Sequence, residues 1–324
     1  MKRSVTMQAG FFACLKMVIM AVVLTAGGLY VRGEHYLGVT AGFDSPLLSD
    51  HLSLTSSRFG YGGMIGGEWL WKKNHFTFEL GLQAAYLTAR YTVSDETLRF
   101  NMRDTQNKQF EYLGYVNERR ESASVFDVRV PLLFGLEYDY VYASLGAIGV
   151  YTVTGRSRQQ ALLTTVGDYD RYYEILTDMP NHGFSDRQPV SGRTSLGSGW
   201  DVRLYAELGT VWHTRMTTYS SSSGRKRGGG RQTKEVKWRA GLFFDYGVRD
   251  LLSGTNIYRS GTSTLPMTDV DPTQFMQVRL RSVYASERAN DARLNNLSFG
   301  VRLTVLFPLS SSGYNFRSCH CVYL

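Results

Sequence analysis

Cysteine and proline are scarce in this sequence, and so are long hydrophobic runs. The 324 residues include 3 cysteines and 7 prolines. Cys319 and Cys321 flank His320 near the end of the chain, too close together for a relaxed disulfide or a full zinc shell, and Cys14 lies near the start. This excludes a fold held together by disulfides. After residue 34, no apolar run reaches the roughly 18 residues of a transmembrane helix, which excludes helical spans.

A strong charge imbalance is also missing. The chain has 36 basic and 28 acidic residues, a formal net charge of +8. Four bases precede residue 34, where there is no acid, so the chain from Glu34 onward has 32 bases against 28 acids and a net charge of +4. So small an excess needs no polyanion to explain it, and we expect no nucleic-acid partner.

Glycine and aromatic residues are abundant. The sequence has 33 Gly, 21 Tyr, 17 Phe and 5 Trp. Glycine-punctuated, aromatic-rich sequences favour strands and tight turns over helices. The composition predicts an all-β fold, and the length suits one large closed architecture better than two soluble domains.

The first 33 residues predict an export signal. Lys2, Arg3 and Lys16 precede the uncharged stretch 17–31, which is shorter than the roughly 20 residues of a membrane-spanning helix. Small residues at the end of this stretch suit cleavage near Gly33, and a short amino-terminal anchor helix is the alternative. We expect residues 1–33 to be a signal peptide, 34–308 an outer-membrane β-barrel and 309–324 a carboxyl-terminal tail.

Period-two alternation of apolar and polar residues organises the remaining chain. In the segment 297–307, every odd position is apolar, whereas most even positions are polar or glycine. Successive strand residues point to opposite faces of a sheet, so this pattern predicts a strand with one apolar face. Eight such strands are expected, at 35–43, 59–71, 76–86, 126–138, 141–153, 200–212, 237–248 and 297–307.

A soluble β-sandwich and a transmembrane barrel would both show this alternation. Here the polar faces carry charges of both signs beside many glycines, which does not suit the solvated face of a sandwich. Aromatic residues such as Phe59, Trp71 and Trp212 lie near segment ends, where a membrane barrel has its interfacial girdles. These features favour a closed antiparallel transmembrane β-barrel of about eight strands.

The connections between the predicted strands alternate in length. Those at 44–58, 92–125, 154–199 and 249–293 are long and are expected to be outside loops, whereas those at 72–75 and 139–140 are short and are expected to be periplasmic. Parts of the outside loops, at 112–122 and 167–179, are rich in aromatic and charged residues, as partner-binding surfaces often are. Strand extensions above the membrane or a short helix on the rim would explain these segments equally well.

One connection does not follow this rule. Residues 213–235 are predicted to be periplasmic, yet they form a long and flexible loop with the basic residues Arg225, Lys226, Arg227 and Arg231. Such a loop could meet anionic headgroups or cell-wall carboxylates, and a solvated turn without a partner explains it equally well.

Two segments carry a resemblance to a known family. The hairpin VFDVRVPLLFGLEYDYVYASLGAIGVYTVTG at 125–155 and the strand LSFGVRLTVLFPL at 297–309 resemble the outer membrane protein β-barrel domain family of Gram-negative bacteria, including its PorT-like members. The resemblance implies location in the outer membrane and, for PorT-like proteins, a role as an accessory subunit of a protein secretion system. The chain departs from the pattern by continuing to residue 324 after its last strand.

The alternation also predicts which charges face the barrel interior. Eight strands leave an interior only wide enough for side chains, so we expect these charges to pair across the lumen and plug it, with a gated or ligand-binding lumen as the alternative. The predicted lumen network consists of Glu68, Glu79, Asp127, Arg129, Glu137, Asp201, Arg203, Glu207, Arg239, Asp245 and Arg302.

Catalysis is not expected. A hydrolytic or acyl-transfer site would need a histidine beside a serine or a carboxylate near the outer rim. His35, His75 and His213 fall at predicted periplasmic strand ends, and the nearness of Ser185 to His182 in the sequence carries little weight. We therefore expect no enzyme activity, no cofactor and no metal.

The sequence thus predicts a monomeric outer-membrane barrel that contacts membrane lipid and acts as a structural or interaction scaffold of the cell envelope. Its outside loops would bind envelope or secretion-machinery proteins. An accessory subunit of a secretion system is the main alternative, and a narrow channel or a lipid-modifying enzyme is a weaker one.

Overall fold

The computed structural model describes residues 33–50, 55–104, 106–169, 174–179, 183–219, 231–251, 266–271, 274–286 and 293–309. The predicted signal peptide before Gly33 and the predicted tail after Leu309 lie outside these residues, as do His51, His182 and all three cysteines. The elements are β1 Glu34–Asp50, β2 Thr55–Lys73, β3 Phe76–Val93, β4 Glu96–Arg103, β5 Gln109–Tyr138, β6 Val141–Tyr169, β7 Glu174–Thr177, β8 Gln188–Leu196, β9 Gly199–Tyr219, β10 Arg231–Gly247, β11 Thr268–Asp271, β12 Gln274–Leu280, the 3-10 helix η3 Val283–Ala285 and β13 Leu294–Pro308.

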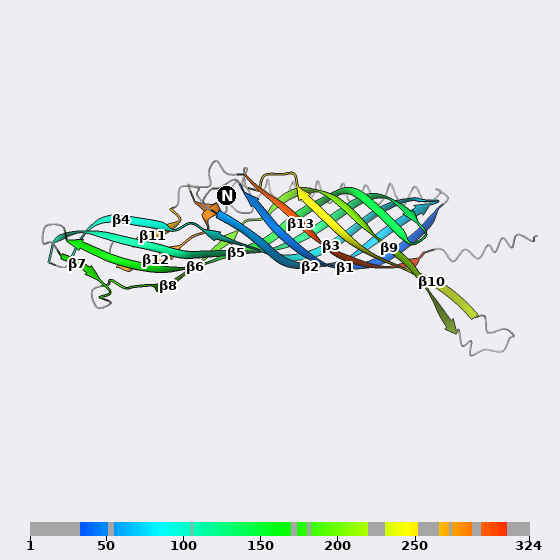
Figure 1. Ribbon diagram of the computed structural model, residues 1–324. Coiled ribbons are helices and arrows are strands. Elements are labelled where there is room, and N and C mark those ends of the chain that lie inside the picture. The colour runs from blue at the N-terminus through cyan, green and yellow to red at the C-terminus, as the bar shows by residue number, and fades with distance from the viewer. Residues whose placement is uncertain are drawn as a thin grey trace, which may run out of the picture.

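Eight of the strands pair side by side in a ring. The order is β1, β2, β3, β5, β6, β9, β10 and β13, with antiparallel neighbours throughout. β13 pairs in turn with β1, from Tyr36↔Pro308 to Asp50↔Leu294. Figure 1 shows these strands wound around one end of an elongated molecule. The predicted all-β fold with about eight principal strands is confirmed, and each predicted segment falls on one of them, with only Val248 one residue beyond β10.

Tight turns join the strands at one end of the ring. β2 and β3 are joined at Asn74 and His75, and β5 and β6 at Asp139 and Tyr140. Asn74 and Asp139 have φ values of 54° and 26°, in the left-handed region that Asn and Asp tolerate better than most residues. We call this end the turn end.

β9 and β10 continue past the turn end as a two-stranded ribbon, which projects from the ring in Figure 1. Their pairing extends from Lys237↔His213 to Arg231↔Tyr219. The prediction of a flexible loop over 213–235 is therefore wrong for both of its flanks, which are strands. Arg231 begins β10, whereas Arg225, Lys226 and Arg227 lie outside the described residues.

At the opposite end, strands continue far beyond the ring. β5 and β6 are 30 and 29 residues long, well above the roughly 9 to 11 residues that a tilted strand needs to cross a bilayer. We call the described parts of 94–125 and 154–196, which include β4, β7 and β8, the extension (Figure 1). Most residues of 92–125 and 154–199 form paired strands, so the prediction of long loops is wrong there, and for 112–122 the alternative of a strand extension is the one found.

A β-bulge explains why the alternation concealed these strands. The pairing of β5 with β6 passes from Asn117↔Leu162 to Arg120↔Gln160, so β5 carries one extra residue there, and Glu118 has a φ of 51°. Before the bulge the buried residues are even-numbered, such as Val116, and after it they are odd-numbered, beginning with Arg119. A period-two pattern that changes phase no longer predicts one continuous strand.

The described part of the segment after β10 packs against the end of the ring opposite the turn end. It pairs β11 with β12 and continues into η3, whose residues Val283, Tyr284 and Ala285 are all buried. Val283 and Tyr284 belong to an apolar cluster with Leu48 of β1 and Leu294 of β13. We call the described residues 266–271 and 274–286 the cap. The prediction of an outside loop at 249–293 is thus wrong for the cap, which is folded onto the other strands.

The extension has an apolar core of its own. Tyr112 is fully buried in a cluster that contains Leu98 of β4, Leu163 of β6, Phe184 and Leu280 of the cap. Burial raises the pKa of Tyr112 to about 12, because the phenolate would lose its hydration.

This shift predicts alkaline destabilisation of the extension. Below a pH of about 10 the phenol is protonated in both states, whereas between about 10 and the folded value only the unfolded chain ionises. The free energy of unfolding should therefore fall as the pH rises through this window. Hydrogen exchange of the extension measured against pH should show the fall, and Tyr112→Phe should reduce its slope. An unchanged slope in Tyr112→Phe would contradict the assignment to this residue.

The outer surface of the ring is apolar. Phe134, Leu145 and Leu242 are 60%, 66% and 68% exposed, and leucine, valine and aromatic side chains are exposed on every strand of the ring. The charged residues between these apolar side chains, such as Glu79 and Arg302, are buried in the ring interior, so this part of the ring has the reverse of the side-chain distribution of an ordinary globular protein. Among the described residues, no helix has the length and hydropathy to cross a membrane.

Candidate functional site

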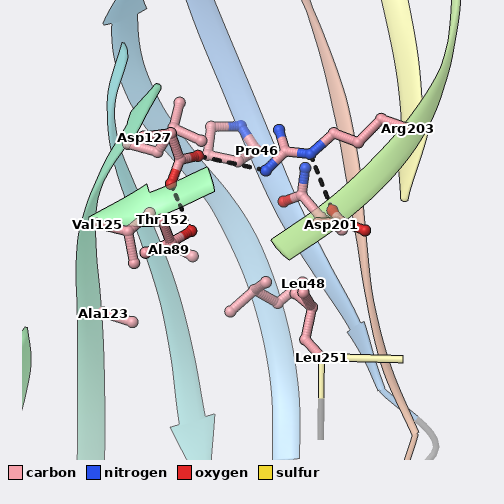
Figure 2. Close-up of a pocket in the computed structure, with 12 residues that line it drawn as sticks. Pro46, Leu48, Ala89, Ala123, Val125, Asp127, Thr152, Asp201, Arg203 and Leu251 are labelled. Carbon is pink, nitrogen blue, oxygen red and sulfur yellow. Dashed lines mark hydrogen bonds and ion pairs between the residues drawn. The ribbon is translucent and has the colours of Figure 1, made fainter. Parts of the chain in front are cut away.

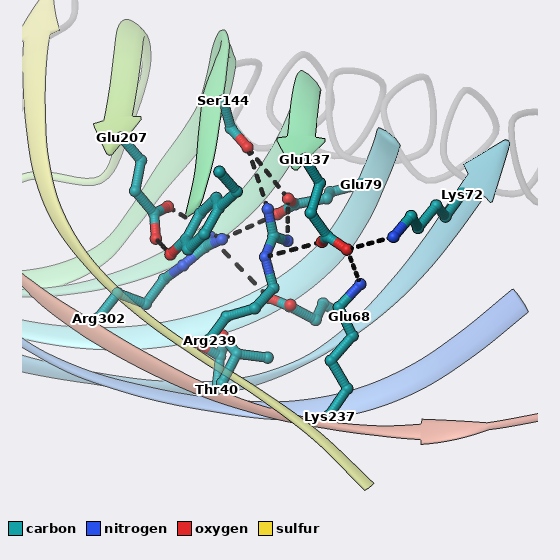
Figure 3. A network of polar contacts seen from close by, with 12 residues as sticks. Thr40, Glu68, Lys72, Glu79, Glu137, Ser144, Glu207, Lys237, Arg239 and Arg302 are labelled. Carbon is teal, nitrogen blue, oxygen red and sulfur yellow. Dashed lines mark hydrogen bonds and ion pairs between the residues drawn. The ribbon is translucent and has the colours of Figure 1, made fainter. Parts of the chain in front are cut away.

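The interior of the ring contains a network of charged side chains, shown in Figure 3. Its centre is the carboxylate of Glu79 on β3. Arg239 on β10 pairs with one oxygen, Arg302 on β13 donates to the other at 2.8 Å, and the Ser144 hydroxyl on β6 donates at 3.2 Å. Each of these side chains is at most 2% exposed. Strands from three parts of the ring are thereby tied to one carboxylate.

Arg302 also links two further carboxylates. Its guanidinium lies 3.0 Å from Glu207 and 3.9 Å from Glu68. Glu207 accepts hydrogen bonds from the hydroxyls of Tyr205, at 2.7 Å, and Tyr142. The lack of a side chain at Gly241 makes room for this contact, because a Cβ there would overlap the Tyr142 hydroxyl and the Glu207 carboxylate.

Toward the turn end, Glu137 on β5 is held by two lysines. Lys72 on β2 donates to it at 2.6 Å, and Lys237 on β10 pairs with the same oxygen. Arg239 lies 3.9 Å from the other oxygen and so joins this group to Glu79. This half of the network has four carboxylates against four basic side chains. Its formal charge is balanced.

A second group of charges lies nearer the cap. Arg203 on β9 is 3.1 Å from Asp201, 3.4 Å from Asp127 and 3.6 Å from Asp245. Arg129 on β5 pairs with Asp44 on β1 at 2.9 Å. The Thr152 hydroxyl donates to Asp127 at 2.6 Å. Figure 2 shows this contact and those of Arg203 with Asp127 and Asp201.

Next to this second group, on the side toward the cap, is a small cavity with a volume of about 20 Å³, whose lining residues are drawn in Figure 2. Asp127, Asp201 and Arg203 line its polar side, and apolar residues such as Leu48 and Leu251 line the side toward the cap. The cavity can hold about one water molecule and no larger solute.

A wider groove lies on the outside of the ring. It has a volume of about 800 Å³ and is formed mainly where small residues of neighbouring strands, such as Gly209 and Ala240, leave room between Leu208, Leu242 and Val301. It belongs to the apolar outer surface and brings no catalytic group together.

The structure places every residue of the predicted lumen network in the ring interior. All eleven, from Glu68 to Arg302, are at most 4% exposed, and each has an ion-pair partner within the interior. Sequence reasoning missed Asp44, one residue beyond the predicted first strand, and left Lys237 out of the lumen network although the alternation places it on the polar face of the predicted seventh strand. It also missed Tyr142 and Tyr205, since the alternation places them inward but tyrosine gives no sign of an ion-pair role.

Two histidines of the described residues stack on aromatic rings. His35 stacks on Trp69 with ring centroids 5.7 Å apart, and His75 stacks on Tyr138 at 4.4 Å. Ser185 donates to Gln188 at 2.9 Å. Within the part of the chain that the structure describes, no cluster of three or more His, Cys, Asp or Glu has the geometry of a metal site.

No known family matches the sequence, and no curated protein is similar to it. Among solved structures, the chain shows a distant similarity to the TodX deltaS2S3 mutant monoaromatic hydrocarbon channel. The alignment has 7% identity, covers 86% of this chain and 91% of the channel, and has a TM-score of 0.18. A similarity this low establishes neither a shared fold nor a shared function.

Proposed function

We propose that this protein is an outer-membrane β-barrel with a side-chain-filled interior, and that it serves the cell envelope as an interaction scaffold through its extension. The observation that carries the proposal is the reversed distribution of side chains in the ring. Exposed apolar residues surround it, whereas buried charges fill it. Apolar side chains on the outside lose contact with water only if the ring is surrounded by lipid.

Aromatic side chains support this orientation. Trp212 and Trp238 stack near the turn end with ring centroids 6.3 Å apart. Phe59, which is exposed, packs edge-on against Phe299 at 5.3 Å toward the extension. Aromatic residues at both limits of an apolar belt are typical of the two interfaces of a membrane barrel. With the short turns on the periplasmic side, the extension lies outside the outer membrane and the β9–β10 ribbon lies in the periplasm.

A structural role is favoured over a channel. Ion pairs between β3, β10 and β13 cross the interior, and the cap covers the end that the network leaves free. Opening a pore would require several buried ion pairs to break together, at a cost of about 3 to 5 kcal/mol for each charge left without a partner.

The extension is the part suited to partners. β4 pairs with β5 on one side, and among the described residues no strand pairs with its other edge. A free edge strand offers backbone donors and acceptors to a partner strand. The same surface would serve the second candidate, an accessory subunit of a secretion system, which the PorT-like resemblance suggests. Loss of secreted cargo on deletion of the gene would favour this second candidate.

Heat-modifiable mobility tests the barrel. In a detergent extract of the outer-membrane fraction, the unboiled protein should migrate differently in electrophoresis from the boiled protein, because a closed barrel resists unfolding by detergent. A soluble periplasmic protein without a mobility shift would contradict the proposal. Planar-bilayer recordings test the filled interior, since a stable large conductance would exclude it while leaving the barrel intact.

A further inference from the structure

A row of arginines crosses the outer surface where the ring meets the extension. The strand register places Arg58 of β2 opposite Arg90 of β3, and Arg90 opposite Ser122 of β5. Ser122 is in turn opposite Arg158 of β6, and Arg158 is opposite Arg193 of β8. Five neighbouring strands thus contribute one continuous row of side chains, about 20 Å wide at the usual strand spacing.

Two more arginines widen the row. Arg120 lies two residues from Ser122 on β5, and Arg156 lies two residues from Arg158 on β6, so both are about 7 Å along the strand on the same face. All six side chains are exposed. We call Arg58, Arg90, Arg120, Arg156, Arg158 and Arg193 the arginine belt.

Acids near this row in the described strands already have partners: Glu118, two residues before Arg120, pairs with Arg187 at 2.7 Å. Glu121 is the one acid in the strand segments around the belt. These segments are β2 before the bulge at Arg58/Tyr61, β3 from Tyr86, β5 from Arg119 to Phe126, β6 from Val153 to Gln160, and β8. Glu121 is buried and accepts hydrogen bonds from Ser157 and Gln159. None of the belt arginines forms an ion pair with a carboxylate of the described residues. Arginines directly opposite each other repel, so Arg58↔Arg90 and Arg158↔Arg193 would be destabilising without an anion.

The arginine belt adjoins the apolar outer surface. Phe59 follows Arg58 directly, and the guanidinium of Arg90 lies over the Tyr61 ring, 5.1 Å from its centroid. The exposed aromatics Tyr86 and Phe126 lie four residues from Arg90 and Ser122, toward the apolar belt. Charges that border an apolar belt through a layer of aromatic side chains lie at the depth of lipid headgroups.

We propose that the arginine belt binds the phosphate groups of anionic lipid headgroups in the membrane leaflet next to the extension. The planar guanidinium donates two parallel hydrogen bonds to a phosphate, and anions placed between opposite arginines relieve their repulsion. The ligand class is a phosphorylated glycolipid or phospholipid whose acyl chains rest on the apolar surface of the ring. This inference rests on the proposed membrane-embedded barrel and adds a lipid-binding site to it.

The test compares two triple variants of the full-length protein. Arg90→Gln, Arg158→Gln and Arg193→Gln remove half of the belt. The control combines Arg99→Gln, Arg103→Gln and Arg279→Gln, which removes the same charge from exposed positions on β4 and β12. Each protein is first inserted into vesicles of phosphatidylcholine alone. Binding of lipid A with two phosphates, and of the same lipid without phosphates, is then counted by native mass spectrometry of the detergent-solubilised protein.

We expect all three proteins to insert into phosphatidylcholine. The unchanged protein and the control should bind the phosphorylated lipid, with affinity falling at least about tenfold in the belt variant. Equal binding of the two lipids, or an equal loss in the control variant, would overturn the lipid-binding site and leave the barrel intact. Failure of the unchanged protein to insert into phosphatidylcholine would overturn the barrel, and the site with it.

Discussion

Replacing Arg302 with methionine is expected to lower the free energy of unfolding of the ring by about 3 to 5 kcal/mol, the usual cost of leaving a buried charge without its partner. Arg302 lies within 4 Å of Glu79, Glu207 and Glu68, more carboxylates than any other basic side chain of the turn-end half approaches. Methionine keeps an apolar, unbranched side chain about as long as the aliphatic stem of arginine and lacks the guanidinium, so the variant loses the charge and its hydrogen bonds. The measurement is the denaturant midpoint at which the heat-modifiable form disappears.

The matched control is Arg99→Met, which makes the same change at an exposed position on β4 and should leave the midpoint unchanged. A second variant separates charge from packing. Adding Glu68→Gln to Arg302→Met removes one of the carboxylates left without a partner, so the double variant should be more stable than Arg302→Met alone. A double variant that is less stable than the single one would show that the carboxylates are not held by Arg302.

The ring and its interior charges could be predicted because each ring strand keeps a period of two along the stretch that carries the apolar outer surface. Within such a stretch, an inward position such as Glu79 fixes the direction of Gln83 and of every second residue between them. Charges at inward positions have only one another as partners when the interior is as narrow as eight strands make it. The pattern therefore predicts which charges meet, although it does not give the pairs.

The extension and the cap could not be predicted in this way. The bulge at Glu118 changes the phase of β5, and a second irregularity opposite Phe126 and Asp127 leaves both Val153 and Thr154 of β6 exposed. Each half of β5 and β6 therefore shows only a short run of period-two alternation, which is typical of a short strand followed by a loop. The cap is folded by contacts with residues far away in the sequence, which no local pattern encodes. Arg119, the buried arginine that contacts the cap, lies between Glu118 and Arg120 in the sequence. Three consecutive charged residues are typical of a solvated loop.

Replacing Arg119 with methionine is expected to release the cap while the ring stays folded. The Arg119 guanidinium is fully buried and donates to the backbone oxygens of Met267, at 3.3 Å, and Arg281, and to the Thr268 hydroxyl at 3.2 Å. It also lies 3.6 Å from the carboxylate of Glu96 on β4. One side chain thus joins both strands of the cap hairpin to the extension, and its loss should cost the cap about 3 to 5 kcal/mol of local stability.

Limited proteolysis measures this release, since cleavage between residues 267 and 285 should become many times faster in Arg119→Met. Arg120→Met is the matched control, because this neighbouring arginine is exposed and should not affect cleavage. Heat-modifiable mobility should persist in both variants, since the pairs of Arg302 and Arg239 lie in the ring and do not involve the cap.

If the cap of Arg119→Met stayed resistant, the apolar contacts of Val283 and Tyr284 would hold it without the arginine. If the ring unfolded as well, the cap and the ring would form one cooperative unit, and the second charged group beneath the cap would depend on it.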